Sequence, residues 1–191
     1  MEGDEVNVDA GERKAPRGSS SAAIDAAFRE SFEAFYGREL KPVIGLAFVL
    51  SGSRAGAEDL AQDAFMSALR HWDRVGAYDD PGGWVRRVLV NRIRSGFRRR
   101  AAEVKALARL RDRGFEAPEL PAEAAETWAA VRRLPAKQAQ VIALRYYDQR
   151  SIEDIARILD RSENTVKTHL QRAKRALALM LGEEETDNAH H

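Results

Sequence analysis

The feature that most constrains the fold is a pair of short helical patterns between Ser151 and Leu181, separated by a polar turn. The turn residues Asp160 and Arg161 interrupt the first pattern, and Ser162 can cap a second helix, because a serine hydroxyl accepts a free backbone N–H of the first turn. The sequence therefore predicts a helix–turn–helix in this segment. The apolar residues of its first helix recur at helical spacing: Ile152, Ile155, Ala156 and Leu159.

The predicted second helix has two contrasting faces. In a helix–turn–helix that binds DNA, this helix lies in the major groove, where cations meet phosphates and polar side chains meet base edges. An ordinary helical hairpin with a solvated basic face is the alternative for this segment taken alone. The buried stripe is expected at Val166, Leu170, Ala173, Leu177 and Met180. The opposite face carries Lys167, Thr168, Gln171, Arg172, Lys174 and Arg175.

Charge is distributed unevenly along the chain, although the formal net charge is only +1. Residues 86–113 hold eleven Lys or Arg and two acids, which gives +9. Residues 128–181 hold eleven basic and five acidic side chains, which gives +6, and residues 25–80 carry −4. Two separate basic blocks indicate two contacts with a polyanion such as DNA.

Composition excludes several classes of site. The chain has no cysteine, which removes disulfides, thiolate zinc sites and cysteine nucleophiles and fits a reducing compartment. The longest apolar run, residues 42–50, is too short to span a bilayer, and the acidic N-terminus does not resemble a signal peptide. We therefore expect a cytoplasmic protein with no membrane insertion, no metal and no cofactor.

Periodicity along the rest of the chain is helical, with no strand-like alternation. The fold class expected is all-α, with two small helical domains joined by a flexible linker and a helix–turn–helix in the C-terminal domain. The helical patterns cover residues 22–50, 55–75, 84–100, 123–134 and 136–147, with a loop at 76–83. The expected organisation is a disordered tail at 1–21, a domain at 22–100, a linker at 101–123, a domain at 124–181 and an acidic tail at 182–191.

Three segments together resemble bacterial RNA polymerase sigma factors of the extracytoplasmic-function type, group IV of the sigma-70 family. AEDLAQDAFMSALRHW (57–72) is similar to the family's polymerase-binding helix. PGGWVRRVLVNRIRSGFRRR (81–100) is similar to its promoter-melting segment, and residues 134–177 to its C-terminal DNA-binding domain. The resemblance implies a non-enzymatic promoter-specificity subunit that binds core RNA polymerase, recognises minus-thirty-five and minus-ten elements and promotes strand opening.

The implied partners are core RNA polymerase, through its clamp coiled coil and flap, and promoter DNA; an anti-sigma factor is a further candidate. One rival interpretation is a free-standing helix–turn–helix regulator, which would bind two half-sites as a dimer. Another is a metal enzyme using Asp59 and Asp63 or Asp79 and Asp80. That reading lacks nearby histidines, a phosphate-binding glycine loop and a nucleophile constellation.

The acidic helix offers a candidate partner surface. Asp59, Gln62 and Asp63 follow i, i+3, i+4 spacing and share one face. Judged by residue type alone, these side chains could equally form the solvated acidic start of a helix with no partner. The resemblance implies that this face docks on the polymerase clamp, with exposed apolar atoms adding anchorage. The candidate polymerase-binding residues are Asp59, Leu60, Gln62, Asp63, Phe65 and Met66.

The loop and helix after residue 77 hold what strand opening requires, which is an aromatic wedge, a pocket for an unpaired base and cations for displaced phosphates. From residue type alone, Trp84 could instead be a core residue and Asn91 a solvated amide. The adjacent Asp79 and Asp80 depart from this pattern, because carboxylates repel phosphates unless they contact base donors. The candidate minus-ten residues are Tyr78, Asp79, Trp84, Arg87, Asn91, Arg94 and Arg98.

The predicted recognition helix supplies the third candidate surface. A glutamine such as Gln171 suits adenine, and an arginine such as Arg172 suits guanine or phosphate. Two tethered domains that each bind weakly gain effective concentration from one another. The candidate minus-thirty-five residues are Arg161, Thr165, Lys167, Thr168, Gln171, Arg172 and Arg175.

Overall fold

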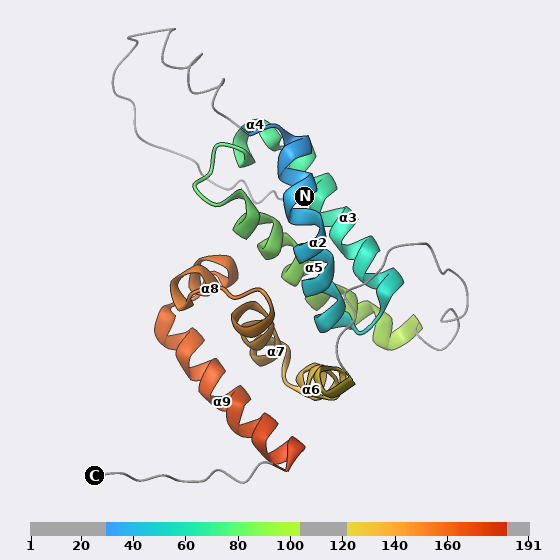
Figure 1. Cartoon of the computed structure of the whole chain (residues 1–191), viewed down its shortest axis with the longest axis vertical. Helices are drawn as coiled ribbons and strands as arrows, with labels where there is room; N and C mark the ends of the chain where they lie inside the picture. Colours follow the sequence, from blue (N-terminus) through green and yellow to red (C-terminus); the bar gives the residue numbers. More distant parts are fainter. Residues whose placement is uncertain (1–29, 104–121, 183–191) are drawn as a thin grey trace, which may run out of the picture.

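The computed structural model describes residues 30–103 and 122–182, and every regular element in these ranges is helical (Figure 1). The all-α class is therefore confirmed. The expected tails and most of the expected linker lie outside the described residues. The first range contains α2 (Phe32–Ser51), α3 (Arg54–Arg70), α4 (Trp72–Val75) and α5 (Pro81–Glu103). The second contains α6 (Ala122–Arg133), α7 (Ala136–Ile142), the π-helical turn η1 (Ala143–Tyr147), α8 (Ile152–Leu159) and α9 (Glu163–Leu181).

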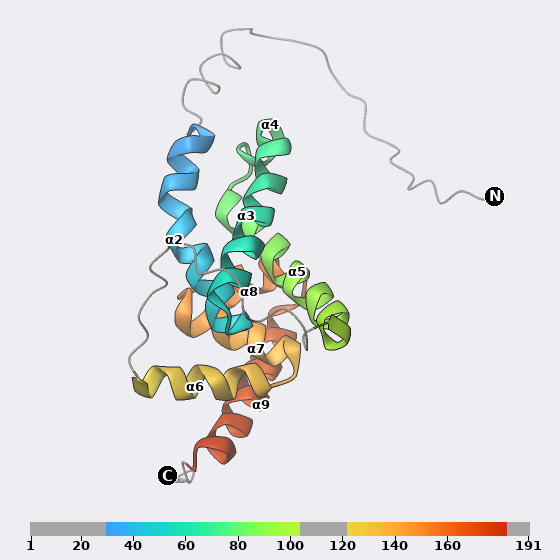
Figure 2. The same cartoon turned by 90° about the vertical axis from the view of Figure 1, so that its right-hand side faces the viewer.

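Helices α2 and α3 form an antiparallel hairpin against which α5 packs (Figure 2). The hairpin turns at Gly52, whose φ of 72° suits a glycine at the end of a helix. Ser53 then caps α3 by accepting a hydrogen bond from the Gly56 amide at 3.2 Å. Helix α2 continues through Pro42 without restarting. The largest fully buried side chains of this half include Phe35, Leu46, Phe65 and Leu89.

Two boundaries in this half differ from the sequence prediction. The expected helix over 55–75 is divided at His71, where α3 ends and the short α4 begins. The expected loop at 76–83 is shorter, because α5 already begins at Pro81. The Asp80 carboxylate accepts a hydrogen bond from the Gly83 amide at 2.7 Å, and proline suits the first helical position. Asp80 is thus the cap of α5.

The C-terminal half forms the predicted helix–turn–helix from α8 and α9. Ser151 and Asp154 form a reciprocal capping box at the start of α8. Asp160 ends that helix with φ 54°, the left-handed conformation that aspartate tolerates better than most residues. Ser162 caps α9 by accepting from the Thr165 amide at 3.2 Å. The caps identified in the sequence therefore fix both ends of the turn.

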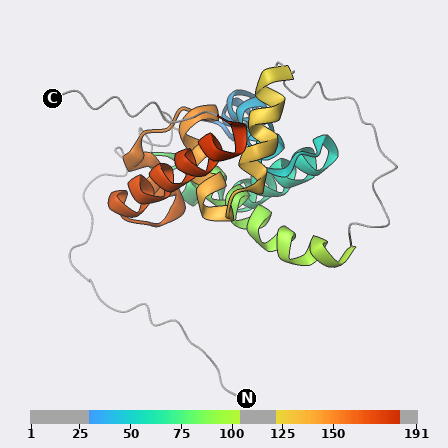
Figure 3. The same cartoon turned by 90° about the horizontal axis from the view of Figure 1, so that it is seen from below.

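The two halves pack on one another and share a continuous core (Figures 2 and 3). Helix α5 contacts α8, while α2 contacts α6 and η1. The rings of Trp128 and Tyr147 meet edge to face, with centroids 5.9 Å apart, and Tyr147 lies against Gly45 of α2. The sequence predicted two domains joined by a flexible linker and made no prediction about a contact between them, so this interface is a finding of the structure.

Candidate nucleic-acid interface

The recognition helix α9 presents the predicted polar face to solvent. Val166 and Ala173 are buried against the rest of the half, while Met180 is exposed because the helix end extends past its neighbours. Arg161 is also exposed, and Thr165 is partly buried at the cap. The Lys167 ammonium lies 3.1 Å from the Glu163 carboxylate. The exposed members of the candidate face are Lys167, Thr168, Gln171, Arg172 and Arg175.

His169 on α9 lies between the two halves and not on the exposed face. Burial lowers the pKa of its imidazole, and the nearby cations Lys137, Arg172 and Arg161 lower that pKa further. It is therefore neutral at pH 7 and lines a small cavity that Asn91 of α5 also lines. This placement favours packing over DNA contact, two roles between which the sequence alone did not distinguish.

The candidate strand-opening residues occupy the loop before α5 and the first five turns of this helix. Tyr78 and Asp79 are exposed, and Trp84 is half-buried against the core, so only part of its ring faces outward. Arg87 and Asn91 are exposed on α5, one turn apart. The side chains of the other two candidates, Arg94 and Arg98, lie outside the described part of the chain.

The adjacent aspartates of the loop have different roles. Asp80 caps α5, and its carboxylate lies 3.7 Å from the Arg150 guanidinium of the C-terminal half. Asp79 is exposed. Only one carboxylate therefore remains to meet nucleic acid, which reduces the electrostatic conflict that the pair creates in the sequence.

The candidate partner surface on α3 borders an apolar groove of about 410 Å³. Asp59, Gln62 and Asp63 are exposed as predicted, and the Asp63 carboxylate pairs with the Arg92 guanidinium at 2.9 Å. Phe65 is only 2% exposed and supports the groove from below instead of offering exposed atoms. Residues lining the groove are Phe32, Tyr36, Leu40, Ile44, Glu58, Gln62, Phe65, Met66 and Leu69.

The exposed apolar rim of this groove extends beyond the residues that the sequence singled out. Met66 is 41% exposed and Leu69 46% exposed, and Tyr36 of α2 is exposed on the other side. Leu60 is half-buried. The i, i+4 spacing of Phe32, Tyr36 and Leu40 is the one sequence signal that could have indicated the contribution of α2.

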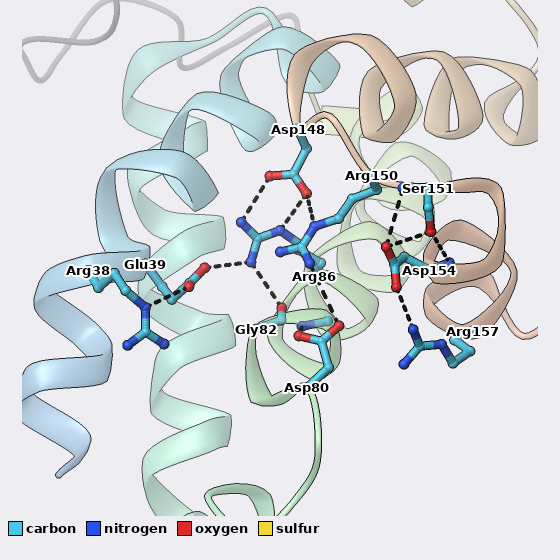
Figure 4. A network of polar contacts seen from close by, with 11 residues as sticks. Arg38, Glu39, Asp80, Gly82, Arg86, Asp148, Arg150, Ser151, Asp154 and Arg157 are labelled. Carbon is cyan, nitrogen blue, oxygen red and sulfur yellow. Dashed lines mark hydrogen bonds and ion pairs between the residues drawn. The ribbon is translucent and has the colours of Figure 1, made fainter. Parts of the chain in front are cut away.

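A buried ionic cluster, which sequence analysis missed, joins α5 to both α2 and the C-terminal half (Figure 4). The Arg86 guanidinium donates to both carboxylate oxygens of Asp148, at 2.6 and 2.9 Å. It also donates to Glu39 at 2.7 Å and to the Gly82 carbonyl at 3.1 Å. The Arg86 side chain is 3% exposed.

The charges of this cluster compensate one another. Burial lowers the pKa of Arg86, but the carboxylates of Asp148 and Glu39 more than offset this and raise it above its usual value. Burial raises the pKa of Glu39, but the guanidinium groups of Arg86 and Arg38 together more than offset this and hold that pKa below its usual range. Arg86 and Glu39 are therefore charged at neutral pH, and removing one member of the cluster leaves its partners buried without compensation.

Within residues 30–103 and 122–182 there is no group of three or more acidic or histidine side chains placed to hold a metal ion. In the same ranges no helix combines the length and apolar character needed to cross a membrane.

Two parts of the chain match known families, Sigma-70 region 2 over residues 35–103 and Sigma-70, region 4 over residues 124–177. The chain is 32% identical over 165 residues to the ECF RNA polymerase sigma factor SigM of Mycobacterium tuberculosis, which covers 84% of this chain and 82% of SigM. It is 26% identical to the ECF RNA polymerase sigma factor BldN of Streptomyces coelicolor over 80% of this chain, and it spans only 61% of BldN.

A solved structure is similar across both halves. It is the sigma factor RpoE from Bartonella quintana, crystallised in complex with the anti-sigma factor NepR. The TM-score is 0.65 at 25% identity, covering 81% of this chain and 98% of that chain. The chain therefore belongs to the sigma-70 family. Within that family it belongs to the extracytoplasmic-function group, as its resemblance to SigM and BldN indicates.

Proposed function

We propose that this chain is a promoter-specificity subunit of RNA polymerase. It binds the core enzyme in the cytoplasm, recognises a minus-thirty-five and a minus-ten element, and promotes strand opening without itself being an enzyme. The observation that carries the proposal is the joint presence of a region 2 match and a region 4 match, each with its own exposed basic or apolar surface. A free-standing regulator would not explain the region 2 half.

The two matches support a division of roles between the domains. Residues 22–100 bind polymerase and the minus-ten element, residues 101–123 are the linker, and residues 124–181 read the minus-thirty-five element. The tails at 1–21 and 182–191 have no assigned role.

The polymerase-binding surface is the groove between α2 and α3. Exposed Met66 and Leu69 can bury apolar atoms against a helix of the clamp coiled coil, while Asp59 and Gln62 at the rim set orientation and association rate. Phe65 is buried beneath the groove and supports the residues that line it. The C-terminal domain would contact the polymerase flap.

Helix α5 with its preceding loop opens the minus-ten element. Tyr78 and the outer part of Trp84 supply aromatic surface for unstacked bases, and Arg87 with Arg94 and Arg98 follows the phosphates. The Asn91 amide can pair with a base edge through one donor and one acceptor. Asp79 would favour a base that offers an amino donor, such as cytosine.

Helix α9 reads the upstream duplex. Its exposed face combines an amide, Gln171, with a guanidinium, Arg172, which are the groups that read adenine and guanine in the major groove. Thr165 and Thr168 add hydroxyls, while Arg161, Lys167 and Arg175 position the helix on phosphates. An anti-sigma factor is a candidate inhibitor, because the similar RpoE was crystallised with NepR.

The test compares one variant that should lose polymerase binding with another that should keep polymerase binding and lose strand opening. Met66→Glu should weaken binding to core RNA polymerase at least ten-fold, because it places a charge in the apolar groove. Leu179→Glu, at an 86% exposed position on α9, is the matched control and should leave binding unchanged.

Asn91→Ala should retain core binding and reduce open-complex formation on a promoter that the wild type transcribes, measured by permanganate reactivity of unpaired thymines. Equal loss of core binding and opening would contradict the role given to Asn91. Failure of the wild type to bind core polymerase would overturn the proposed function as a whole.

A further inference from the structure

The three methionines are the only sulfur-containing residues of this chain, because it has no cysteine. Met1 lies outside the described residues. Met66 on α3 and Met180 on α9 are each 41% exposed. In the absence of thiols, the methionine thioether is the side-chain group that mild two-electron oxidants attack first. An oxidant that reaches the folded protein therefore meets two accessible methionines, and their surroundings differ.

Met66 belongs to the groove between α2 and α3, whose lining is mostly apolar. Packed aromatic rings form much of this lining. The rings of Phe32 and Tyr36 stack with centroids 5.9 Å apart, and Tyr36 meets Phe65 edge to face at 5.0 Å. Met66 is the unbranched, adaptable side chain of the rim, of the kind that fits itself to an apolar partner. The apolar character of this rim therefore depends in part on its thioether.

Oxidation converts this apolar side chain into a polar one. Hydrogen peroxide transfers one oxygen atom to Sδ of Met66, so that an S–O bond forms as the O–O bond breaks. The sulfur is oxidised by two electrons, and the remaining oxygen leaves with both protons as water. The sulfoxide that results is polar and accepts hydrogen bonds.

A sulfoxide on the rim opposes docking of an apolar partner. When the partner covers it, the sulfoxide oxygen loses its hydrogen bonds to water, and a buried polar group without a partner costs binding free energy. The other exposed apolar side chains of the rim, Tyr36 and Leu69, have no thioether and keep their character. The effect of peroxide on the groove is thus confined to one residue.

We propose that Met66 is an oxidation site through which peroxides weaken the binding of core RNA polymerase. This inference rests on the polymerase-binding role proposed for the groove. Methionine sulfoxide reductases return the sulfoxide to the thioether, so the modification is reversible. Because coupling between two events on one site is reciprocal, bound polymerase protects Met66 from peroxide.

Met180 is the internal control for this site. Its exposed fraction equals that of Met66, but it lies in the last turn of α9 and does not line the groove. This end of α9 is at the opposite end of the molecule from α4 (Figures 1 and 2). Equal exposure makes both thioethers accessible, so comparing the two separates an effect of the groove from general oxidation.

The test treats the free protein with hydrogen peroxide and removes the oxidant before core polymerase is added. Peptide mass spectrometry should find one added oxygen on Met66 and one on Met180. The dissociation constant for core polymerase should rise at least about five-fold over that of the untreated sample. Methionine sulfoxide reductases should restore it to within about two-fold of that sample.

Two variants, each compared with its own untreated sample, locate the effect. Peroxide should change the dissociation constant of Met66→Leu less than about two-fold, because leucine is apolar and has no thioether. In Met180→Leu the loss of about five-fold should persist. In the wild type, saturating core polymerase should slow oxidation of Met66 at least about five-fold and leave the rate at Met180 unchanged.

Undiminished binding by wild type that is fully oxidised at Met66 would overturn the inference, as would an equal loss in Met66→Leu. Peroxide that converts Met180 but spares Met66 would also overturn it. Helical circular dichroism should be unchanged by oxidation; unfolding that Met66→Leu prevents would show a role in stability and refute one in docking. Failure of the untreated wild type to bind core polymerase would remove the proposed function together with this inference, whereas binding that peroxide leaves intact removes the inference alone.

Discussion

Neighbouring residues in this chain have opposite roles that residue type does not distinguish. Arg86 and Arg87 are adjacent, yet one is buried between two carboxylates and the other is exposed. Successive residues on a helix point about 100° apart, so Arg86 enters the buried ionic cluster while Arg87 stays at the surface, where it pairs with Asp160 at 3.3 Å. Phe65 and Met66 differ in the same way, the first buried and the second on the rim of the groove.

This difference predicts separate outcomes for two substitutions on α3. Phe65→Ala should lower the free energy of unfolding by about 3–5 kcal/mol, because it leaves a cavity in a packed core. Met66→Ala should lower it by less than about 1 kcal/mol, since the side chain is partly in water. Urea denaturation followed by circular dichroism measures both. Equal costs would show that the groove is not open to solvent.

Lowering the pH should reduce the free energy of unfolding through protonation of Glu39. Its pKa is held below the usual value by Arg86, so its stabilising contribution is present at neutral pH and is lost as pH falls below about 4.3. Glu39→Gln should therefore flatten the dependence of the unfolding free energy on pH below about 4.3. Glu33→Gln, at an exposed position on the same helix, should not. If acid lowers the unfolding free energy of Glu39→Gln as steeply as that of the wild type, this role of Glu39 is refuted.

Most predictions about single residues came from helical spacing and other local sequence patterns. The contacts that these patterns missed were missed for a physical reason. The exposed face of α9 and the acids of α3 followed from helical spacing alone. The contacts of Asp80 and Arg86 could not be predicted from helical spacing, because their partners Arg150 and Asp148 lie more than 60 residues away in the sequence. No periodic pattern in a single sequence records such a contact.

At the scale of elements, caps predicted helix ends better than apolar spacing did. Asp160 and Ser162 correctly placed the end of α8 and the start of α9. Apolar spacing predicted one continuous helix through His71. In the structure α3 ends before this residue and α4 begins after it. Apolar spacing also predicted one helix over residues 136–147 but gave no sign that the last part, η1, would be π-helical.

The recognition helix provides the prediction at this scale. Arg172→Ala should reduce discrimination at one upstream base pair by about 1–3 kcal/mol, if its guanidinium reads a base edge. Lys174→Ala is the comparison, because that ammonium lies over the Tyr146 ring and should affect all sequences alike. Holoenzyme binding to a panel of single-base promoter variants measures both. A uniform loss in Arg172→Ala would instead indicate a phosphate contact.

For the whole molecule, the sequence predicted two helical domains and their order, and the structure adds their mutual packing. The hydrogen bonds between the halves join residues of α2 and α5 to partners 50 to 83 residues away in the sequence. The interface combines a buried ionic cluster with the close approach of Tyr147 to Gly45.

The central claim is that this chain gives RNA polymerase its choice of start site. The most direct measurement is in vitro transcription with purified core enzyme on a library of randomised promoters, with product starts sequenced. We expect starts preceded by two enriched elements at a constant spacing, and loss of the downstream one alone in Asn91→Ala. Starts no more selective than those of core enzyme alone would contradict the account.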